Sequence, residues 1–336
     1  MEKILIIKTG YTEFLEGENN SRKVSYGDVL RVTPLLHKYK GDHVTWVTDK
    51  KAFPLLKENP YINRLLEYDF TTALQLQSEE FDRVINLEKI PGICALSDKI
   101  RARRARYGFT FNTQTGTAEA LDKAVEVLAV GASPEVKKGN LKIFHELLFE
   151  MVDKKWEKEE IILGYRPRTV EIYDVGLNIH VGEKWPTKLW PKEYWDKLES
   201  MLIEKGYKVS RQDKQGPKVL ENLYEYMDWI NSCKLIISCD SLGLHLSLAL
   251  GKKVFGLFGP TPHREVYFHG RGIAILPEFI PDCMPCFEGK CKREKNCMGE
   301  ISLEKVYNET ISLLEKMDVI KRREYALERI STDYSS

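Results

Sequence analysis

The sequence predicts an α/β protein made of two doubly wound halves, each a mostly parallel sheet covered by helices on both faces. Short apolar runs alternate along the chain with stretches of helical periodicity, and this alternation is typical of βαβ units. The strand-like runs show no polar alternation, as in residues 4–7, which indicates strands buried on both faces. The 336 residues are enough for two domains of about 100–200 residues each.

The expected elements can be placed along the chain in order. Strands are predicted at residues 4–7, 43–47, 83–87, 177–181, 207–209, 234–238 and 254–258. The clearest helix should begin at Pro191, because proline suits a first helical position, and should end before Gly206. Its apolar face is formed by Tyr194, Trp195, Leu198, Met201 and Leu202.

A polar stretch between about Glu150 and Val175 weakens the alternation and is expected to connect the two halves. We therefore predict an N-terminal domain, a C-terminal domain and a polar C-terminal tail, at residues 1–165, 166–320 and 321–336.

The composition excludes several classes of protein. Lys and Arg number 51 against 50 Asp and Glu, which argues against a surface built to coat nucleic acid. A hydrophobic content of 43% excludes intrinsic disorder. No apolar run approaches the roughly 18 residues of a membrane-spanning helix, and the four apolar residues after Lys3 are too few for a signal-peptide core. A cytoplasmic protein is expected.

The turn after the strand at 234–238 has the pattern of an anion site. The strand leads into Asp240-Ser241, and a helix is predicted to start there with Gly243 and His245 in its first turn. Free backbone N–H groups at a helix N-terminus attract phosphate, and a glycine lets the phosphate approach closely. The alternative is that Asp240 or Ser241 merely caps the helix. The spacing alone does not separate these two interpretations.

The same segment resembles a known family. Residues 240–263 read DSLGLHLSLALGKKVFGLFGPTPH, which is similar to the nucleotide-binding motif of glycosyltransferase family 9, the ADP-heptose:lipopolysaccharide heptosyltransferases. Further stretches agree in order: 27–34 (GDVLRVTP), 54–64, 81–87, 103–109, 178–182 and 185–191 (WPTKLWP). The resemblance is weakest across 110–175 and 210–230. It implies a GT-B fold, in which two Rossmann-like domains face a cleft, with the acceptor in the N-terminal half and the nucleotide-sugar in the C-terminal half.

The resemblance also implies roles for individual residues. Inverting sugar transfer needs a base for the acceptor hydroxyl and positive potential for the leaving diphosphate. Asp28 matches the family's catalytic aspartate, although a plain first-turn aspartate is the alternative. Lys188 matches the family's phosphate-contacting lysine. The other side of the donor pocket is expected to be formed by Asp240, Ser241, Leu242, Gly243 and His245. No Asp-x-Asp motif is present, so we expect no catalytic metal.

Two features depart from the simple pattern. Residues 8–26 form a longer loop than the family usually has, which suggests an altered acceptor or a lid. The four arginines Arg101, Arg103, Arg104 and Arg106 lie within six positions. They are interpreted either as a solvated helix end followed by a strand or as a docking patch for a phosphorylated glycolipid or the anionic inner membrane. No nucleic-acid-binding motif accompanies them.

Four cysteines follow the spacing C-x2-C-x4-C-x5-C, at Cys283, Cys286, Cys291 and Cys297. Four thiolates within 15 residues can hold Zn or Fe in a tetrahedral site. The alternative is a set of reduced thiols or adventitious disulfides. In the related autotransporter heptosyltransferases a cysteine knuckle binds iron, so the resemblance implies a structural metal here.

The function expected from these features is transfer of a sugar, heptose from ADP-heptose, onto a lipopolysaccharide core or related surface glycan. One alternative is a glycosyltransferase that uses another nucleotide-sugar or a protein acceptor. A second is a non-catalytic scaffold assembled through the metal knuckle. A third is a different GT-B enzyme, such as a sugar-nucleotide epimerase, which would release free UDP.

Overall fold

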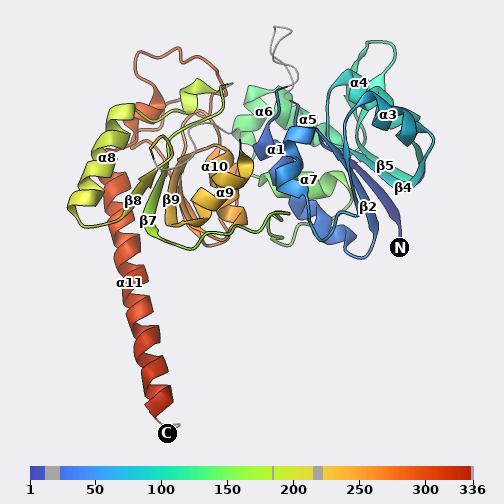
Figure 1. Cartoon of the computed structure of the whole chain (residues 1–336). Coiled ribbons are helices and arrows are strands. Elements are labelled where there is room, and N and C mark those ends of the chain that lie inside the picture. The colour runs from blue at the N-terminus through green and yellow to red at the C-terminus, as the bar shows by residue number, and fades with distance from the viewer. Residues whose placement is uncertain (12–22, 184, 215–221, 334–336) are drawn as a thin grey trace.

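The computed structural model describes residues 1–11, 23–183, 185–214 and 222–333, with side chains described up to residue 320 in the last range. Two α/β units lie side by side, each with its own sheet, and the last helix projects beyond the second unit (Figure 1). Each sheet is bordered by helices, as the alternating sequence pattern predicts.

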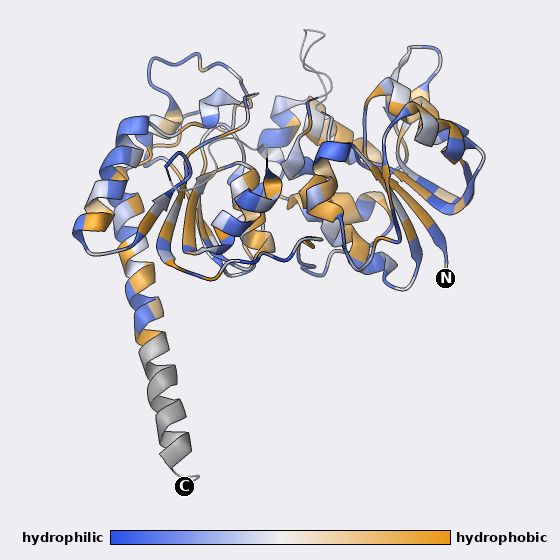
Figure 2. Cartoon of the chain, viewed as in Figure 1, coloured by the Kyte–Doolittle hydropathy of each residue, from blue (hydrophilic) through white to orange (hydrophobic). Residues whose placement is uncertain are grey.

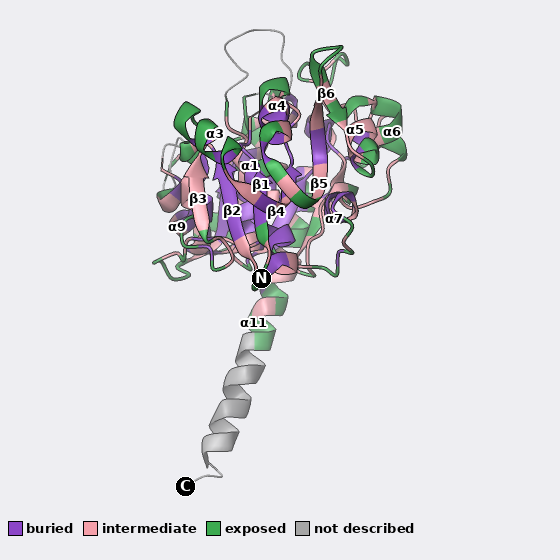
Figure 3. Ribbon diagram, turned by 90° about the vertical axis from the view of Figure 1, so that its right-hand side faces the viewer, coloured by how far each residue is buried: buried purple, intermediate pink, exposed green. Residues whose placement is uncertain are grey.

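The first sheet has the strand order β3-β2-β1-β4-β5-β6. Its strands are β1 (Lys3–Ile7), β2 (His43–Thr48), β3 (Arg64–Glu67), β4 (Glu80–Asn86), β5 (Arg101–Asn112) and β6 (Thr117–Ala120). All pairs are parallel except β5–β6. The central strands β1, β2 and β4 are the most buried, whereas β3 is intermediate along its length (Figure 3). The direction of strand order reverses at β1, which creates a crevice beyond its carboxyl end.

Short helices surround this sheet. They are α1 (Tyr26–Arg31), η1 (Thr33–Tyr39), η2 (Lys50–Ala52), α2 (Phe53–Leu56), α3 (Phe70–Gln77), α4 (Pro91–Lys99), α5 (Ala124–Ala132), α6 (Pro134–Gly139) and α7 (Phe144–Met151).

The second sheet is parallel throughout, with the order β11-β10-β9-β7-β8. Its strands are β7 (Tyr173–Asn178), β8 (Val209–Arg211), β9 (Cys233–Cys239), β10 (Lys253–Leu257) and β11 (Gly272–Ile275). The helical segments are η3 (Pro186–Lys188), α8 (Lys192–Glu204), α9 (Leu223–Asn231), α10 (Leu242–Ala249), η4 (His263–Glu265), η5 (Cys297–Glu300) and α11 (Leu303–Asp333). Here the strand order reverses at β7, so a second crevice lies beyond β7 and β9.

The strands predicted from apolar runs are present, and the differences fall on polar or short segments. Two predicted strands are displaced along the chain: the one expected at 177–181 is β7 at Tyr173–Asn178, and the one expected at 207–209 is β8 at Val209–Arg211. Pro191 is the N-cap of α8 rather than its first residue. Four strands were not predicted from apolar runs: β3, β5, β6 and β11. Helix α4 ends at Lys99 and β5 begins at Arg101. The arginine run therefore lies in a strand rather than at a helix end.

The domain boundary at residues 165 and 166 stays a prediction. Helix α7 and strand β7 are joined by residues 152–172, which contain no helix or strand. Helix α11 continues through most of the segment predicted as a tail.

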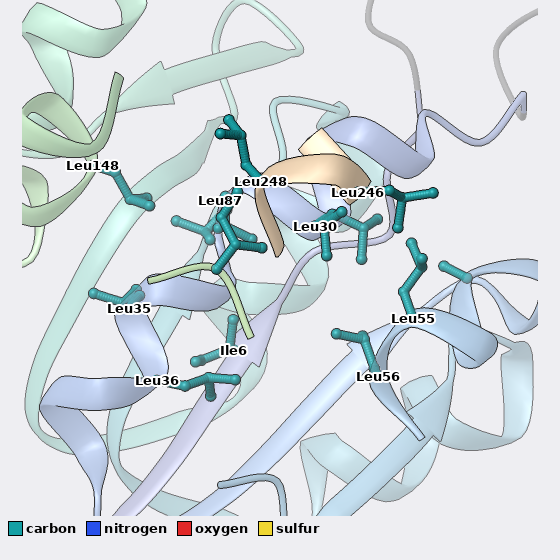
Figure 4. Close-up of a cluster of buried hydrophobic side chains, with 14 of the residues drawn as sticks. Ile6, Leu30, Leu35, Leu36, Leu55, Leu56, Leu87, Leu148, Leu246 and Leu248 are labelled. Carbon is teal, nitrogen blue, oxygen red and sulfur yellow. The ribbon is translucent and has the colours of Figure 1, made fainter. Parts of the chain in front are cut away.

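The two halves share one hydrophobic cluster. Leu246 and Leu248 of α10 belong to the same buried cluster as Leu30 of α1 and Leu55 of α2; in Figure 4, Leu246 lies near Leu30 and Leu55, and Leu248 near Leu87. The apolar residues are concentrated on the strands and on the inner faces of the helices (Figure 2). Burying one leucine side chain contributes about 1.5–3 kcal/mol. This shared core therefore fixes α1 against α10, an arrangement also seen in their direct packing.

Gly108 is a position where the fold requires glycine. Its φ is +93°, and a Cβ there would lie 1.8 Å from the Asn86 carbonyl oxygen on the neighbouring strand.

We expect Gly108→Ala to lower the free energy of unfolding by about 2 kcal/mol or more, because the cost of backbone strain and the cost of overpacking add to one another. Urea denaturation measures the effect. Gly116→Ala is the matched control, since its φ is +72° and nothing lies within 4 Å of its Cβ position. Equal losses in both variants would contradict the expectation.

Candidate active site at the contact between helices α1 and α10

The sites predicted in the two halves meet where α1 faces α10. A Cβ added to Gly27 would lie 3.6 Å from Cδ2 of His245, so the first turn of α1 reaches the imidazole across the interface. Helix α1 follows β1, where the order of the first sheet reverses, and α10 follows β9, the neighbour of β7 at the reversal of the second sheet. The structure therefore brings the predicted catalytic Asp28 to the same place as the predicted donor-binding residues.

Asp28 lies in the first turn of α1, and its side chain is 51% exposed. Loss of hydration in the cleft opposes its charge, but Lys8 and Arg31 outweigh this and hold the pKa of Asp28 below its ordinary value. Arg31 Nη1 lies 3.9 Å from Asp28 Oδ1, and Ser25 adds a hydrogen bond. Asp28 is therefore an ionised, accessible carboxylate at neutral pH.

Lys8 is held beside Asp28 by a buried ion pair. Its Nζ lies 3.2 Å from Oε1 of Glu88, which is fully buried at the end of β4. The same carboxylate oxygen accepts a hydrogen bond of 2.8 Å from the Gly10 backbone N–H. These contacts fix the chain at the carboxyl end of β1, where the loop to α1 begins. The roles of Lys8 and Glu88 were not predicted, because a charge that follows a strand looks like any solvated residue.

On the other side of the interface, Lys188 and Asp240 form a close ion pair. Lys188 Nζ lies 2.8 Å from Asp240 Oδ2 and donates to the Asp240 carbonyl at 3.3 Å. Burial raises the pKa of the Asp240 carboxyl, but the Lys188 charge outweighs it and holds that pKa far below the usual range. The structure thus places the two predicted donor-binding residues together and orients the ammonium group at the N-terminus of α10.

Neither Asp240 nor Ser241 caps α10 through its side chain. The Ser241 hydroxyl instead accepts a hydrogen bond of 3.0 Å from the Asn178 amide, which also donates to Ser238 at 2.8 Å. Ser241 thus occupies the N-cap position of α10 without a capping hydrogen bond from its side chain. Tyr226 completes this buried network by donating to Asn178. Asn178 is the residue that the sequence pattern passed over.

The glycine at 243 is required by packing. A Cβ at Gly243 would lie 2.4 Å from the Asn178 amide nitrogen and 2.6 Å from the Tyr226 hydroxyl. The backbone of α10 therefore approaches β7 closely at its first turn, where Leu242 is the first helical residue. This close approach leaves the start of the helix at the carboxyl ends of β7 and β9.

His245 is buried and neutral at pH 7. Burial, followed by the nearby Arg31 charge, lowers the pKa of His245 to about 4. Its Nε2 lies 3.9 Å from Asp240 Oδ1. The imidazole can therefore donate a hydrogen bond to an anion, but as a neutral ring rather than a cation.

The arginine run is tied into the fold. Arg103 pairs with Glu80 at 2.7 Å, and Arg104 pairs with Glu2. Arg106 donates to the backbone carbonyls of Ser97 and Ile100 at the end of α4. These partners favour a structural interpretation of this strand over a docking patch.

The four cysteines lie in one loop that contacts the Lys188 segment. Burial, followed by the charges of the three other thiols of the set, raises the pKa of the Cys297 thiol to about 11. Within the part of the chain that the structure describes, no three His, Cys, Asp or Glu side chains are arranged to hold a metal ion. Thr187 donates to the Glu288 carbonyl at 2.6 Å and accepts at its own carbonyl from Asn296 at 3.1 Å.

Residues 12–22 of the predicted insertion lie outside the described residues. Its ends are paired: Tyr11 and Val24 form an antiparallel bridge, and Lys23 forms an ion pair with Glu183 of the second half. Among the described residues, no helix combines the length and apolar character needed to cross a membrane.

Comparison with known proteins identifies the relatives of this site. Residues 219–297, which contain α10 and the cysteine loop, match glycosyltransferase family 9 (heptosyltransferase). The predicted resemblance to glycosyltransferase family 9 is confirmed. Among curated relatives, lipooligosaccharide heptosyltransferase 2 of Haemophilus influenzae is 28% identical over 130 residues. That match covers 32% of this chain and spans about a third, 36%, of the relative's length.

Solved structures of the family share the whole architecture. The E. coli ADP-heptose lipopolysaccharide heptosyltransferase II superposes with a TM-score of 0.62 at 16% identity, covering 94% of this chain and 99% of that one. The iron-containing dodecameric glycosyltransferase of enterotoxigenic E. coli superposes with a TM-score of 0.56 at 13% identity, covering 94% and 77%. The predicted GT-B fold of two Rossmann-like domains is thereby confirmed.

The buried histidines predict an acid-sensitive fold. The pKa of His145 is lowered to about 3, chiefly by burial, and that of His245 to about 4. Unfolding returns both pKa values to about 6.5, so the unfolded chain binds more protons below that pH. We expect the free energy of unfolding to fall as pH decreases from about 6.5 toward 4.

Urea denaturation at a series of pH values measures this dependence. His145→Gln should flatten it, because the amide can keep the hydrogen bond to the Arg31 carbonyl without titrating. The exposed His180, changed to Gln, is the control. An unchanged pH slope in the His145 variant would contradict the assignment.

Proposed function

We propose that the chain is an inverting glycosyltransferase that moves a sugar, heptose from ADP-heptose, onto a lipopolysaccharide core or a related surface glycan. The observation that carries this proposal is the position of an ionised Asp28 on one side of the α1–α10 contact and the Lys188–Asp240 pair on the other. A base and a cation for the leaving group are the two elements that the reaction requires.

In the proposed reaction Asp28 takes the proton of the acceptor hydroxyl as its oxygen forms a bond to the anomeric carbon. The bond between that carbon and the diphosphate oxygen breaks, and the diphosphate leaves with the electron pair. Lys188 and the N-terminus of α10 stabilise this charge. The lowered pKa of Asp28 keeps it unprotonated at pH 7, and neutral His245 can add a hydrogen bond.

The similar proteins support heptose as the sugar. The curated relative from H. influenzae and the E. coli structure both bear heptosyltransferase names, and the latter is named for ADP-heptose. We infer a cytoplasmic location and an acceptor anchored at the inner membrane. A protein acceptor is the alternative within the class, and another nucleotide-sugar the alternative donor. The presence of Asp28, Lys188 and His245 at one contact disfavours a non-catalytic scaffold.

The proposal predicts that substitutions of Asp28 and Lys188 affect different quantities, the turnover number and the affinity for ADP. Asp28→Asn should lower kcat by at least about 10²-fold, the usual scale for a general base, and leave ADP affinity unchanged. Lys188→Ala should weaken ADP binding about 10- to 100-fold, because a charge-assisted bond contributes about 1.5–3 kcal/mol. Transfer assays with ADP-heptose and calorimetry with ADP separate the two.

Lys192→Ala is the control for the lysine, since Lys192 is the exposed first residue of α8 and pairs only with Asp196 among its described contacts. Unaltered turnover in Asp28→Asn would exclude the proposed base. Unaltered ADP affinity in Lys188→Ala would place the diphosphate elsewhere.

We further propose that the cysteine loop holds one structural Zn or Fe ion. The spacing of four thiols within 15 residues, C-x2-C-x4-C-x5-C, suits either metal. The iron-containing glycosyltransferase of E. coli supports iron. The metal would fix the loop against Thr187 and has no step in the transfer itself.

Purified protein should therefore carry about one tightly held Zn or Fe per chain. Cys286→Ser should release it, since a neutral hydroxyl is a poor ligand for a soft site, and should lower the Tm. Because Thr187 joins the loop to Lys188, a smaller loss of ADP affinity is expected as well. Elemental analysis of protein prepared without added metal is the measurement, with Cys94→Ser as the control outside the loop. Metal near zero, with four freely reactive thiols, would refute the site.

A further inference from the structure

We propose that Arg31 is a positioning residue for the transfer reaction, holding Asp28 of the first half and Glu265 of the second half on the two arms of its guanidinium group. This role rests on the proposed function. Through it, the orientation of the base depends on the domain that binds the donor.

The contacts of Arg31 reach both halves of the molecule. Its Nη1 lies 3.9 Å from Asp28 Oδ1, and its Nη2 lies 3.8 Å from Glu265 Oε2. A guanidinium group is planar and rigid, so one arm cannot move without the other. Arg31 is therefore a direct connection between the two carboxylates.

The guanidinium group is itself held in place. Its central carbon lies 3.9 Å from the ring centroid of Phe144, and its side chain is only 18% exposed. The Arg31 carbonyl also contacts Nε2 of His145 at 2.9 Å. A side chain stacked and enclosed in this way has lost most of its freedom, which is what a positioning role requires.

Glu265 is the partner on the donor side. It ends η4, which follows β10, and its side chain is 20% exposed. Burial raises the pKa of Glu265, and the charges that face it come from Arg31, Lys137, Lys188 and Asp240. Of these, Arg31 is in direct reach, with Nη2 3.8 Å from Glu265 Oε2, and its other arm lies 3.9 Å from Asp28.

A simpler interpretation is available. Arg31 is the last residue of α1, where a cation stabilises a helix through its dipole. That role would affect stability but would not separate kcat from donor affinity. The two interpretations therefore differ in a measurable way.

The test compares Arg31→Ala and Arg31→Lys with the wild-type chain in ADP-heptose transfer. We expect Arg31→Ala to lower kcat about 10- to 100-fold, the scale of a small misplacement of a catalytic group, with ADP affinity changed less than about 3-fold. Guanidinium ion at non-denaturing concentration should restore part of the lost kcat, and Arg31→Lys should be intermediate. Should Arg31→Ala not fold, Arg31→Gln serves in the same comparison.

A double-mutant cycle tests the link to the second half. Glu265→Gln should also lower kcat, by a smaller factor, and should have little further effect in the Arg31→Ala background, because coupled residues are not additive. Arg83→Ala is the matched control: Arg83 is similarly enclosed, at 22% exposure, and pairs with Glu2 at 2.7 Å on the first sheet. It should lower the Tm without loss of kcat and without response to guanidinium.

Each result decides the matter. Loss of kcat in Arg31→Ala that guanidinium restores, with non-additivity toward Glu265→Gln, supports the positioning role. A loss of Tm alone, as in Arg83→Ala, or full additivity with Glu265→Gln, overturns it while leaving the proposed function intact. Absence of transfer by the wild-type chain overturns the proposed function and this role together.

Discussion

The contact between α1 and α10 is the constraint on which the rest of the molecule depends. Each helix starts at the carboxyl end of a parallel strand, where its own sheet leaves a crevice. The hydrophobic cluster that contains Leu30 and Leu246 packs these two helices against each other. The proposed base, Asp28, belongs to the first half, and the proposed cation for the leaving diphosphate, Lys188, belongs to the second. The apolar packing between the halves therefore creates the proposed site.

Electrostatics then sets the state of each group at this contact. Lys8 and Arg31 keep Asp28 ionised, and Lys188 does the same for Asp240. Burial keeps His245 neutral. Such a pattern combines an unprotonated carboxylate on the acceptor side with a paired ammonium on the donor side. Binding of a diphosphate beside Lys188 would add negative charge where the structure already supplies a cation and a helix N-terminus.

The sequence predicted the fold class and the buried strands well, because parallel strands covered on both faces leave continuous apolar runs such as 4–7. For β5 it predicted a strand only as part of one interpretation of the arginine run, because a run of charged residues resembles a solvated helix end, whereas here Arg103 and Arg104 find partners in Glu80 and Glu2. Motif resemblance located Asp28, Lys188 and His245, whose proximity the structure shows. It could not find Arg31, Glu265 or Asn178, because their importance lies in contacts between residues far apart in the chain.

A crystal structure of the chain with a non-transferable analogue of ADP-heptose tests the central claim most directly. The account predicts the diphosphate within hydrogen-bonding distance of Lys188 Nζ and the N-terminus of α10, with the anomeric carbon turned toward Asp28. Arg31 should still lie between Asp28 and Glu265. A diphosphate bound away from Lys188, or an anomeric carbon turned away from α1, would contradict it.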